Sequence, residues 1–176
     1  SGIYQYGATE WRDLDAAINK ALEFSDNIVL WGTSCGGGPV SSWLVNTDDK
    51  NKIKGIIYEA PVINFWESVE VNGAARFPWL PSQLFSYFKI FTEVRYGVDF
   101  SEMDFTDAVI NSTIPTLLFH GDDDEWVPVS MSDLIASERK ENFTYIRYEN
   151  VGHVTSWNAD PDNYVYQLEL FLNSLN

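Results

Sequence analysis

A serine, a histidine and an aspartate that stand far apart in the sequence have the clearest potential for chemistry. Ser34 is the central residue of the segment 32–36, GTSCG, a G-x-S-x-G motif that follows a short apolar run. A strand that turns directly into a helix strains the corner residue and exposes its hydroxyl, and flanking glycines avoid a Cβ collision there. The motif predicts a nucleophilic serine, although an ordinary Gly-rich turn explains the same residues.

A serine hydroxyl needs a base within hydrogen-bond reach, and a carboxylate must orient that base. The chain has two histidines. His120 ends an apolar run and is expected to shape the following turn, whereas His153 lies in a Gly-containing loop after the last predicted strand. We therefore expect His153 to be the base, with an ordinary surface histidine as the alternative interpretation.

Candidates for the orienting acid are the three adjacent aspartates Asp122, Asp123 and Asp124. A run of acidic residues often does no more than solvate a loop. These three follow a predicted strand, and the carboxyl edge of a parallel sheet faces the ligand crevice of such folds. Their position favours a role at the site but leaves open which of the three would act.

Cys35 follows the candidate nucleophile and is the single cysteine of the chain. Its main-chain N–H, at the start of the predicted helix, would point to where an oxyanion forms. Its thiol is expected to pack in the turn rather than react. A single cysteine cannot form an internal disulfide.

Hydrophobic patterns place these residues on alternating strands and helices. Short apolar runs predict strands, and apolar residues spaced three and four apart predict helices. Because a helix joins successive strands, we expect an α/β fold with a mostly parallel sheet of about four strands. The predicted strands are 28–31, 53–59, 114–120 and 143–148; the predicted helices are 9–24 with Thr9 as N-cap, 35–45, 130–138 and 161–175; residues 1–8 are predicted to be a loop.

Residues 62–113 differ from the rest of the chain. They are rich in aromatic side chains and are broken by Pro78 and Pro81. Their length of roughly 50 residues exceeds a usual connection between strands. We predict a mainly helical insertion over the sheet, within a single domain that spans residues 1–176; a pair of ordinary crossover helices is the alternative.

Composition bounds the class of protein. The 176 residues are 45% hydrophobic and 15% aromatic, which indicates one folded domain with a real core. The formal net charge of −15 argues against nucleic-acid or membrane partners. We see neither a signal peptide nor an apolar run of about 18 residues, so we expect a soluble, cytoplasmic protein.

Together these motifs resemble the α/β-hydrolase superfamily. The order Ser34, Asp124, His153 matches the serine, acid, histidine order of that family. The segment 120–128, HGDDDEWVP, is similar to the family's acid loop, and this similarity selects Asp124 among the three aspartates. The segment 152–161 resembles the histidine loop of bacterial esterases and serine-peptidase-like hydrolases, and residues 7–14 resemble the helix before the serine motif.

The resemblance covers nearly the whole chain and implies a serine hydrolase that cleaves a small-molecule carboxylic ester (EC 3.1.1) or related acyl bond. Ser34 would attack, His153 would move the proton, Asp124 would orient His153, and the Cys35 N–H would donate to the oxyanion. The insertion 62–113 would form a lid with an apolar acyl pocket. Peptide and thioester substrates stay open, since pocket shape sets that preference. No metal ion or organic cofactor is implied.

The chain departs from the family before the serine motif. Members have several strands there, and here one predicted helix precedes it. The absent part would supply a second oxyanion donor, whose loss typically lowers turnover by about 10²–10³. We therefore expect a truncated α/β-hydrolase fold, with a weak or inactive binding or assembly module as the alternative function. The strand Ile28–Trp31 would be an exposed apolar edge, which predicts a homo-oligomer.

Overall fold

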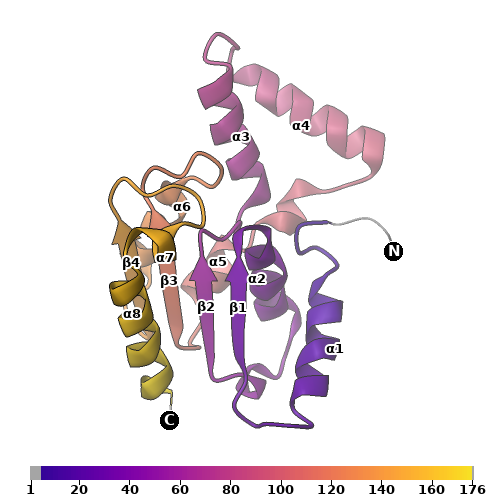
Figure 1. The fold of residues 1–176 in the computed structure, drawn as a ribbon. Coiled ribbons are helices and arrows are strands. Elements are labelled where there is room, and N and C mark those ends of the chain that lie inside the picture. Colours follow the sequence, from indigo (N-terminus) through magenta and orange to yellow (C-terminus); the bar gives the residue numbers. More distant parts are fainter. Residues whose placement is uncertain (1–4, 176) are drawn as a thin grey trace.

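Four short apolar runs form one parallel sheet in the computed structural model, which describes residues 5–175 (Figure 1). The strands lie in chain order across the sheet, and each pairs in parallel with the next. The prediction of an α/β fold with about four parallel strands is thereby confirmed. The strands are β1 (Val29–Thr33), β2 (Gly55–Glu59), β3 (Thr116–Gly121) and β4 (Phe143–Tyr148).

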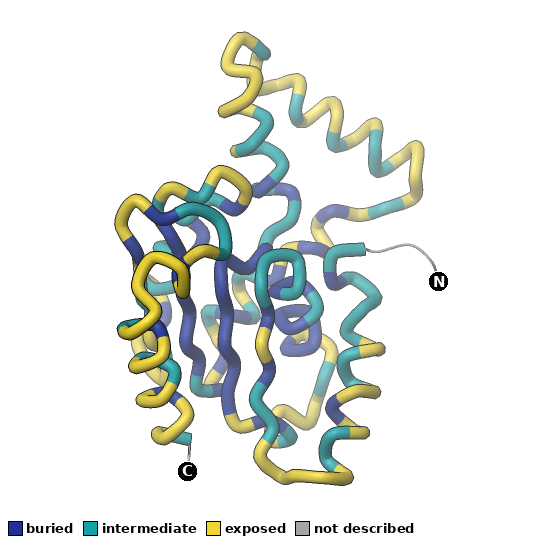
Figure 2. Tube along the Cα trace, in the orientation of Figure 1, coloured by how far each residue is buried: buried dark blue, intermediate teal, exposed yellow. Residues whose placement is uncertain are grey.

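Helices cover both faces of this sheet. The two central strands, β2 and β3, are buried at every position, as expected for parallel strands between two layers. Figure 2 shows this burial as a continuous dark band through the sheet. One face packs against α1 (Trp11–Ala21), α2 (Gly37–Asn46), α5 (Thr106–Ile110) and α6 (Val129–Glu138), and the other against α8 (Pro161–Ser174), which α7 (Ser156–Ala159) precedes.

The start of α1 corrects one prediction. The N-cap residue is Glu10, and no side chain caps the helix, so the assignment of Thr9 was wrong. The Glu10 carboxylate instead accepts hydrogen bonds from the N–H groups of Gln5 at 2.6 Å and Gly7 at 3.0 Å. It thereby holds the turn before the helix. Residues 5–8 lack helix and strand, as predicted, and residues 1–4 of that predicted loop lie outside the described residues.

The insertion is mainly helical. It contains α3 (Phe65–Arg76) and α4 (Gln83–Tyr96), which project beyond the carboxyl ends of the strands (Figure 1), and the short 3-10 helix Phe100–Met103. Pro78 and Pro81 lie in the turn between the two long helices. No residue of α4 is buried. Of the helices within residues 5–175, none has the length and apolar character needed to cross a membrane.

Strand β1 lies at one edge of the sheet. Within the part of the chain that the structure describes, its only partner strand is β2. The Trp31 side chain on this strand is 52% exposed. Helix α1 packs against α2 rather than pairing with the strand, so the outer backbone edge of β1 has no partner strand among residues 5–175.

Candidate active site

Ser34 occupies the corner between β1 and the helix that follows. Its φ of +51° lies in the left-handed region, which costs a non-glycine residue about 1–2 kcal/mol. The chain then winds through one 3-10 turn, Ser34–Gly36, into α2. The Ser34 carbonyl accepts a hydrogen bond from the N–H of Val62 at 2.9 Å, which ties the corner to the segment after β2. This is the strained geometry that the motif predicts.

The glycines of the motif play unequal parts in this turn. A Cβ on Gly32 would lie 2.9 Å from the Gly36 carbonyl oxygen, so the strand side of the corner is crowded as expected. A Cβ on Gly36 would meet nothing within 4 Å, and the expectation of a collision there was wrong. The 3-10 turn rotates Gly37 toward the segment after β2 instead, where a Cβ would lie 2.5 Å from Pro61 Cβ.

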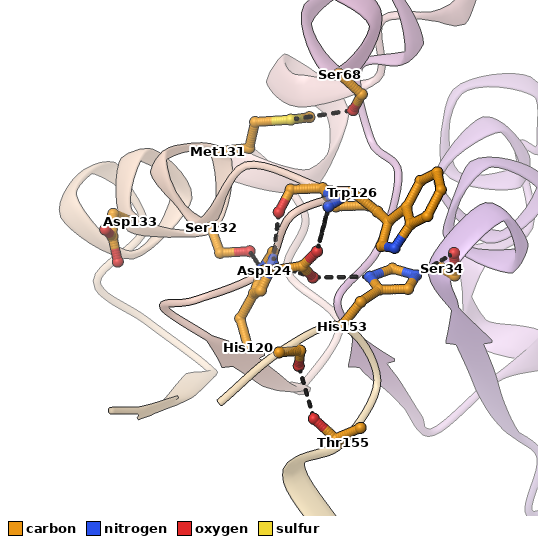
Figure 3. Close-up of polar contacts among 12 residues, drawn as sticks. Ser34, Ser68, His120, Asp124, Trp126, Met131, Ser132, Asp133, His153 and Thr155 are labelled. Carbon is orange, nitrogen blue, oxygen red and sulfur yellow. Dashed lines mark hydrogen bonds and ion pairs between the residues drawn. The ribbon is translucent and has the colours of Figure 1, made fainter. Parts of the chain in front are cut away.

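His153 lies between Ser34 and Asp124 (Figure 3). Its Nε2 is 2.8 Å from Ser34 Oγ, and its Nδ1 is 2.7 Å from Asp124 Oδ2. If Nδ1 donates to the carboxylate, the Nε2 lone pair accepts the serine hydroxyl, which is the tautomer that a general base requires. The structure therefore brings together three predicted residues from the carboxyl ends of β1, β3 and β4, although their catalytic roles stay predictions.

The Asp124 carboxylate is fully buried and accepts hydrogen bonds at both oxygens. Its Oδ1 accepts from the N–H groups of Trp126 at 2.8 Å and Val127 at 2.9 Å. Burial acts to raise the pKa of Asp124, but the bonds from His120, from His153 and from these two N–H groups outweigh it and hold the pKa well below its usual range. The carboxylate is thus ionised at neutral pH and able to orient an imidazole.

The neighbouring aspartates have other surroundings. Asp122 binds Arg147 at 2.9 Å and accepts from the Asn150 N–H at 2.6 Å, which joins the turn after β3 to the turn after β4. Asp123 is exposed. Among the three aspartates, Asp124 is the one that contacts His153.

His120 contacts the same carboxylate from the opposite side. Its side chain is fully buried, and Nε2 lies 3.2 Å from Asp124 Oδ2 and 3.1 Å from the Val127 carbonyl oxygen. Two acceptors at Nε2 require the proton there, so Nδ1 accepts from the Ser132 hydroxyl at 2.7 Å. The bond to Val127 fits the predicted role in the turn, but sequence reasoning missed the contact with Asp124. A histidine at the end of a buried strand needs hydrogen-bond partners for both ring nitrogens. That requirement could have indicated a contact with a nearby acidic side chain.

Replacing His120 with alanine is expected to destabilise the fold by about 1–3 kcal/mol, because the Ser132 hydroxyl and the Val127 carbonyl lose their buried partner. It also removes one of the side-chain donors to Asp124, so kcat should fall. Ser132→Ala is the matched control, since it leaves only His120 Nδ1 without its partner and opens a much smaller cavity, so it should cost less than His120→Ala. Chemical unfolding and ester hydrolysis measure both effects. Equal stability of the two variants would contradict this role of His120.

A cavity of about 420 Å³ opens beside the serine. Ser34, Cys35 and His153 line it, together with Tyr6, Val62, residues of α3 and the loop after Asp124. The predicted oxyanion donor thus belongs to the residue next to the nucleophile on the wall of this cavity. Among the described residues, no group of three or more His, Cys, Asp or Glu side chains is arranged to hold a metal ion.

Comparisons of the sequence with known proteins match this chain to one family and to two partial relatives. The family model of the prolyl oligopeptidase family matches residues 2–176. A non-heme haloperoxidase of Rhodococcus erythropolis is 40% identical over 65 residues, which are 36% of this chain and 24% of that protein. A bifunctional esterase/perhydrolase of Acinetobacter calcoaceticus is 38% identical over 99 residues, which are 55% of this chain and 29% of that protein.

Solved structures extend the likeness to nearly the whole chain. An esterase of Pyrococcus furiosus superposes with a TM-score of 0.70 at 19% sequence identity and matches 99% of this chain. The matched part is 65% of the esterase chain. This chain therefore spans less than two thirds of that structure and a smaller share of the curated relatives.

Proposed function

We propose that this chain, which belongs to the prolyl oligopeptidase family within the α/β-hydrolase superfamily, is a serine hydrolase. Its substrates would be carboxylic esters or related acyl compounds. The observation that carries the proposal is the uninterrupted hydrogen-bond sequence from Ser34 through His153 to the ionised Asp124. Its reactive end opens into the cavity of about 420 Å³. A hydroxyl, a base and an orienting carboxylate in this order are the parts that acyl transfer requires.

In the proposed reaction, Ser34 Oγ attacks the acyl carbon while its proton passes to His153 Nε2. Asp124 accepts a hydrogen bond from Nδ1 and stabilises the imidazolium that forms. The Cys35 N–H donates to the carbonyl oxygen as that oxygen becomes negative. His153 then protonates the leaving alcohol, and a water molecule activated by the same histidine releases the acid from Ser34.

An ester is the substrate that the surroundings favour. Two of the similar proteins are named as esterases, and the wall of the cavity carries apolar side chains such as Val62, Phe65 and Val69. Such a wall suits the hydrocarbon part of an acyl group. Peptides and thioesters are assayed beside esters, since the same machinery attacks all three.

Labelling with a fluorophosphonate tests the proposal directly. The reagent reacts with an activated serine and leaves a covalent adduct that intact mass spectrometry counts. We expect one adduct per chain, together with hydrolysis of p-nitrophenyl acetate. A folded protein that forms no adduct and releases no nitrophenol would contradict catalysis and favour the alternative, a binding or assembly module.

We further propose that the chain forms a homo-oligomer through the edge of β1. An unpaired strand edge with apolar side chains is a template for association, and Trp31 exposes 52% of its surface there. Light scattering at micromolar concentration is expected to report a dimer or larger assembly. Trp31→Lys should shift the protein toward monomer, whereas Trp157→Lys, at a similarly exposed tryptophan on α7, should not. A monodisperse wild-type monomer would rule the assembly out.

A further inference from the structure

A second cavity, of about 580 Å³, lies between α3 and α4 in the insertion. Its wall consists of apolar and aromatic residues with one glycine, and no acidic or basic side chain contributes to it. Helix α4 supplies Leu84, Phe85 and Phe88 to this wall. On a chain with a formal net charge of −15, a charge-free wall of this size marks a site for a hydrocarbon group rather than for a charged one.

This second cavity adjoins the cavity of Ser34. The two share Val69 and Gly73, neighbours one turn apart on α3. The first cavity follows α3 from Phe65 to Arg76, and the eleven steps between these two residues span about 16 Å. A chain that leaves the serine along this helix therefore reaches the shared wall at Val69 and Gly73 after roughly one to two turns.

Gly73 lets α3 and α4 approach closely at this junction. A Cβ at this position would overlap the ring of Phe85, which packs across from α4. A glycine inside a helix costs about 1 kcal/mol relative to alanine. Gly73 therefore lowers the stability of α3 at the point where the two cavities meet. Any larger side chain here must displace Phe85.

The polar side chains of α3 beside Gly73 form hydrogen bonds within the protein. Ser68 Oγ donates to the Asn64 carbonyl at 3.1 Å, and Asn72 Nδ2 donates to the carbonyls of Ser68 at 2.7 Å and Trp126 at 2.5 Å. The bond from Asn72 to Trp126 anchors α3 to the loop that carries Asp124. The wall where the two cavities meet therefore offers mainly hydrocarbon to a ligand. The bond from Asn72 to Trp126 holds α3 in place relative to Ser34.

We propose that the cavity between α3 and α4 binds the distal methylenes of a long unbranched acyl chain whose ester carbonyl lies at Ser34, and that Gly73 sets the chain length accepted. This inference rests on the proposed function and specifies its substrate class as esters of long-chain fatty acids. A single chain that starts at Ser34 would contact both cavities across the shared wall at Val69 and Gly73, which favours a substrate chain over a separate protein partner.

Alkyl fluorophosphonates with ethyl, octyl and dodecyl chains test this. Labelling rates are followed by intact mass, and p-nitrophenyl acetate, octanoate and laurate give the matching kcat/KM series. Burial of a methylene contributes about fourfold to binding, so wild type should prefer dodecyl over ethyl by well over tenfold. Gly73→Leu should lower the dodecyl-to-ethyl ratio, measured within that variant, by about tenfold, which corresponds to fewer than two buried methylenes.

Two further variants separate this effect from misfolding. Ala74→Leu places the same leucine side chain on the exposed side of α3, outside both cavities, and should keep the wild-type chain-length profile. Leu84→Arg places a charge in the second cavity without touching the junction and should weaken long chains alone. An unchanged profile in both Gly73→Leu and Leu84→Arg, with ethyl labelling intact, overturns the acyl-chain site but not the hydrolase. If ethyl fluorophosphonate fails to label the wild-type protein, the proposal of a serine hydrolase is itself overturned.

Discussion

Replacing Ser34 with alanine is expected to abolish both hydrolysis and fluorophosphonate labelling, with kcat lowered by about 10⁴–10⁶. The substitution removes the one oxygen that His153 Nε2 contacts at 2.8 Å and leaves the base without a proton to accept. Triad members act as a unit, so this single change removes nearly all that the other two contribute. Rates with p-nitrophenyl acetate and intact mass after labelling measure the two losses.

The fold should survive this change. Ser34 Oγ bonds to His153 on a partly exposed surface, and the backbone bond from Val62 to the Ser34 carbonyl does not involve the side chain. Thermal unfolding of Ser34→Ala should therefore lie close to that of wild type. Cys35→Ala, which keeps the main-chain N–H, serves as the neighbouring control and should retain the adduct. Persistent labelling in Ser34→Ala would assign the reactive oxygen to another residue.

Local hydrophobic and turn patterns in the sequence were sufficient to predict most of the fold. β4 has the predicted bounds, 143–148, because turn residues flank an apolar run on both sides. The parallel sheet follows from helices that join successive strands. Thr9 was wrongly chosen as a cap because the competing partner, the Glu10 carboxylate, bonds backwards to Gln5 and Gly7. Such a choice depends on the path of the chain before the helix, which propensity does not describe.

Features that depend on contacts between distant segments could not be predicted from the sequence. Gly37 is crowded by Pro61, and His120 reaches both Asp124 and Ser132. Each of these contacts joins different loops or helices, and none leaves a periodic signal in the sequence. The wall that the two cavities share at Val69 and Gly73 likewise depends on the packing of α4 against α3. Residue type predicted the candidates for chemistry, whereas packing between elements decides what surrounds them.

Replacing Asp124 with asparagine is expected to lower kcat by about 10⁴, although it changes only one atom for a group of similar size. The asparagine carbonyl should keep the position of Oδ1, since the N–H groups of Trp126 and Val127 require an acceptor. The amide NH₂ then occupies the position of Oδ2. There it faces the N–H groups of His153 and His120, which both need an acceptor.

His153 can restore its bond only by changing tautomer, so that Nδ1 accepts and Nε2 carries the proton. In that form Nε2 cannot accept the proton of Ser34, and the serine loses its base. Asp122→Asn is the matched control, because Asp122 stands two residues away and bonds Arg147 and the Asn150 N–H instead of the histidines. Ester hydrolysis of the two variants should differ by several orders of magnitude. A loss below tenfold in Asp124→Asn would show that the carboxylate does not orient the base, and another group would have to set the tautomer of His153.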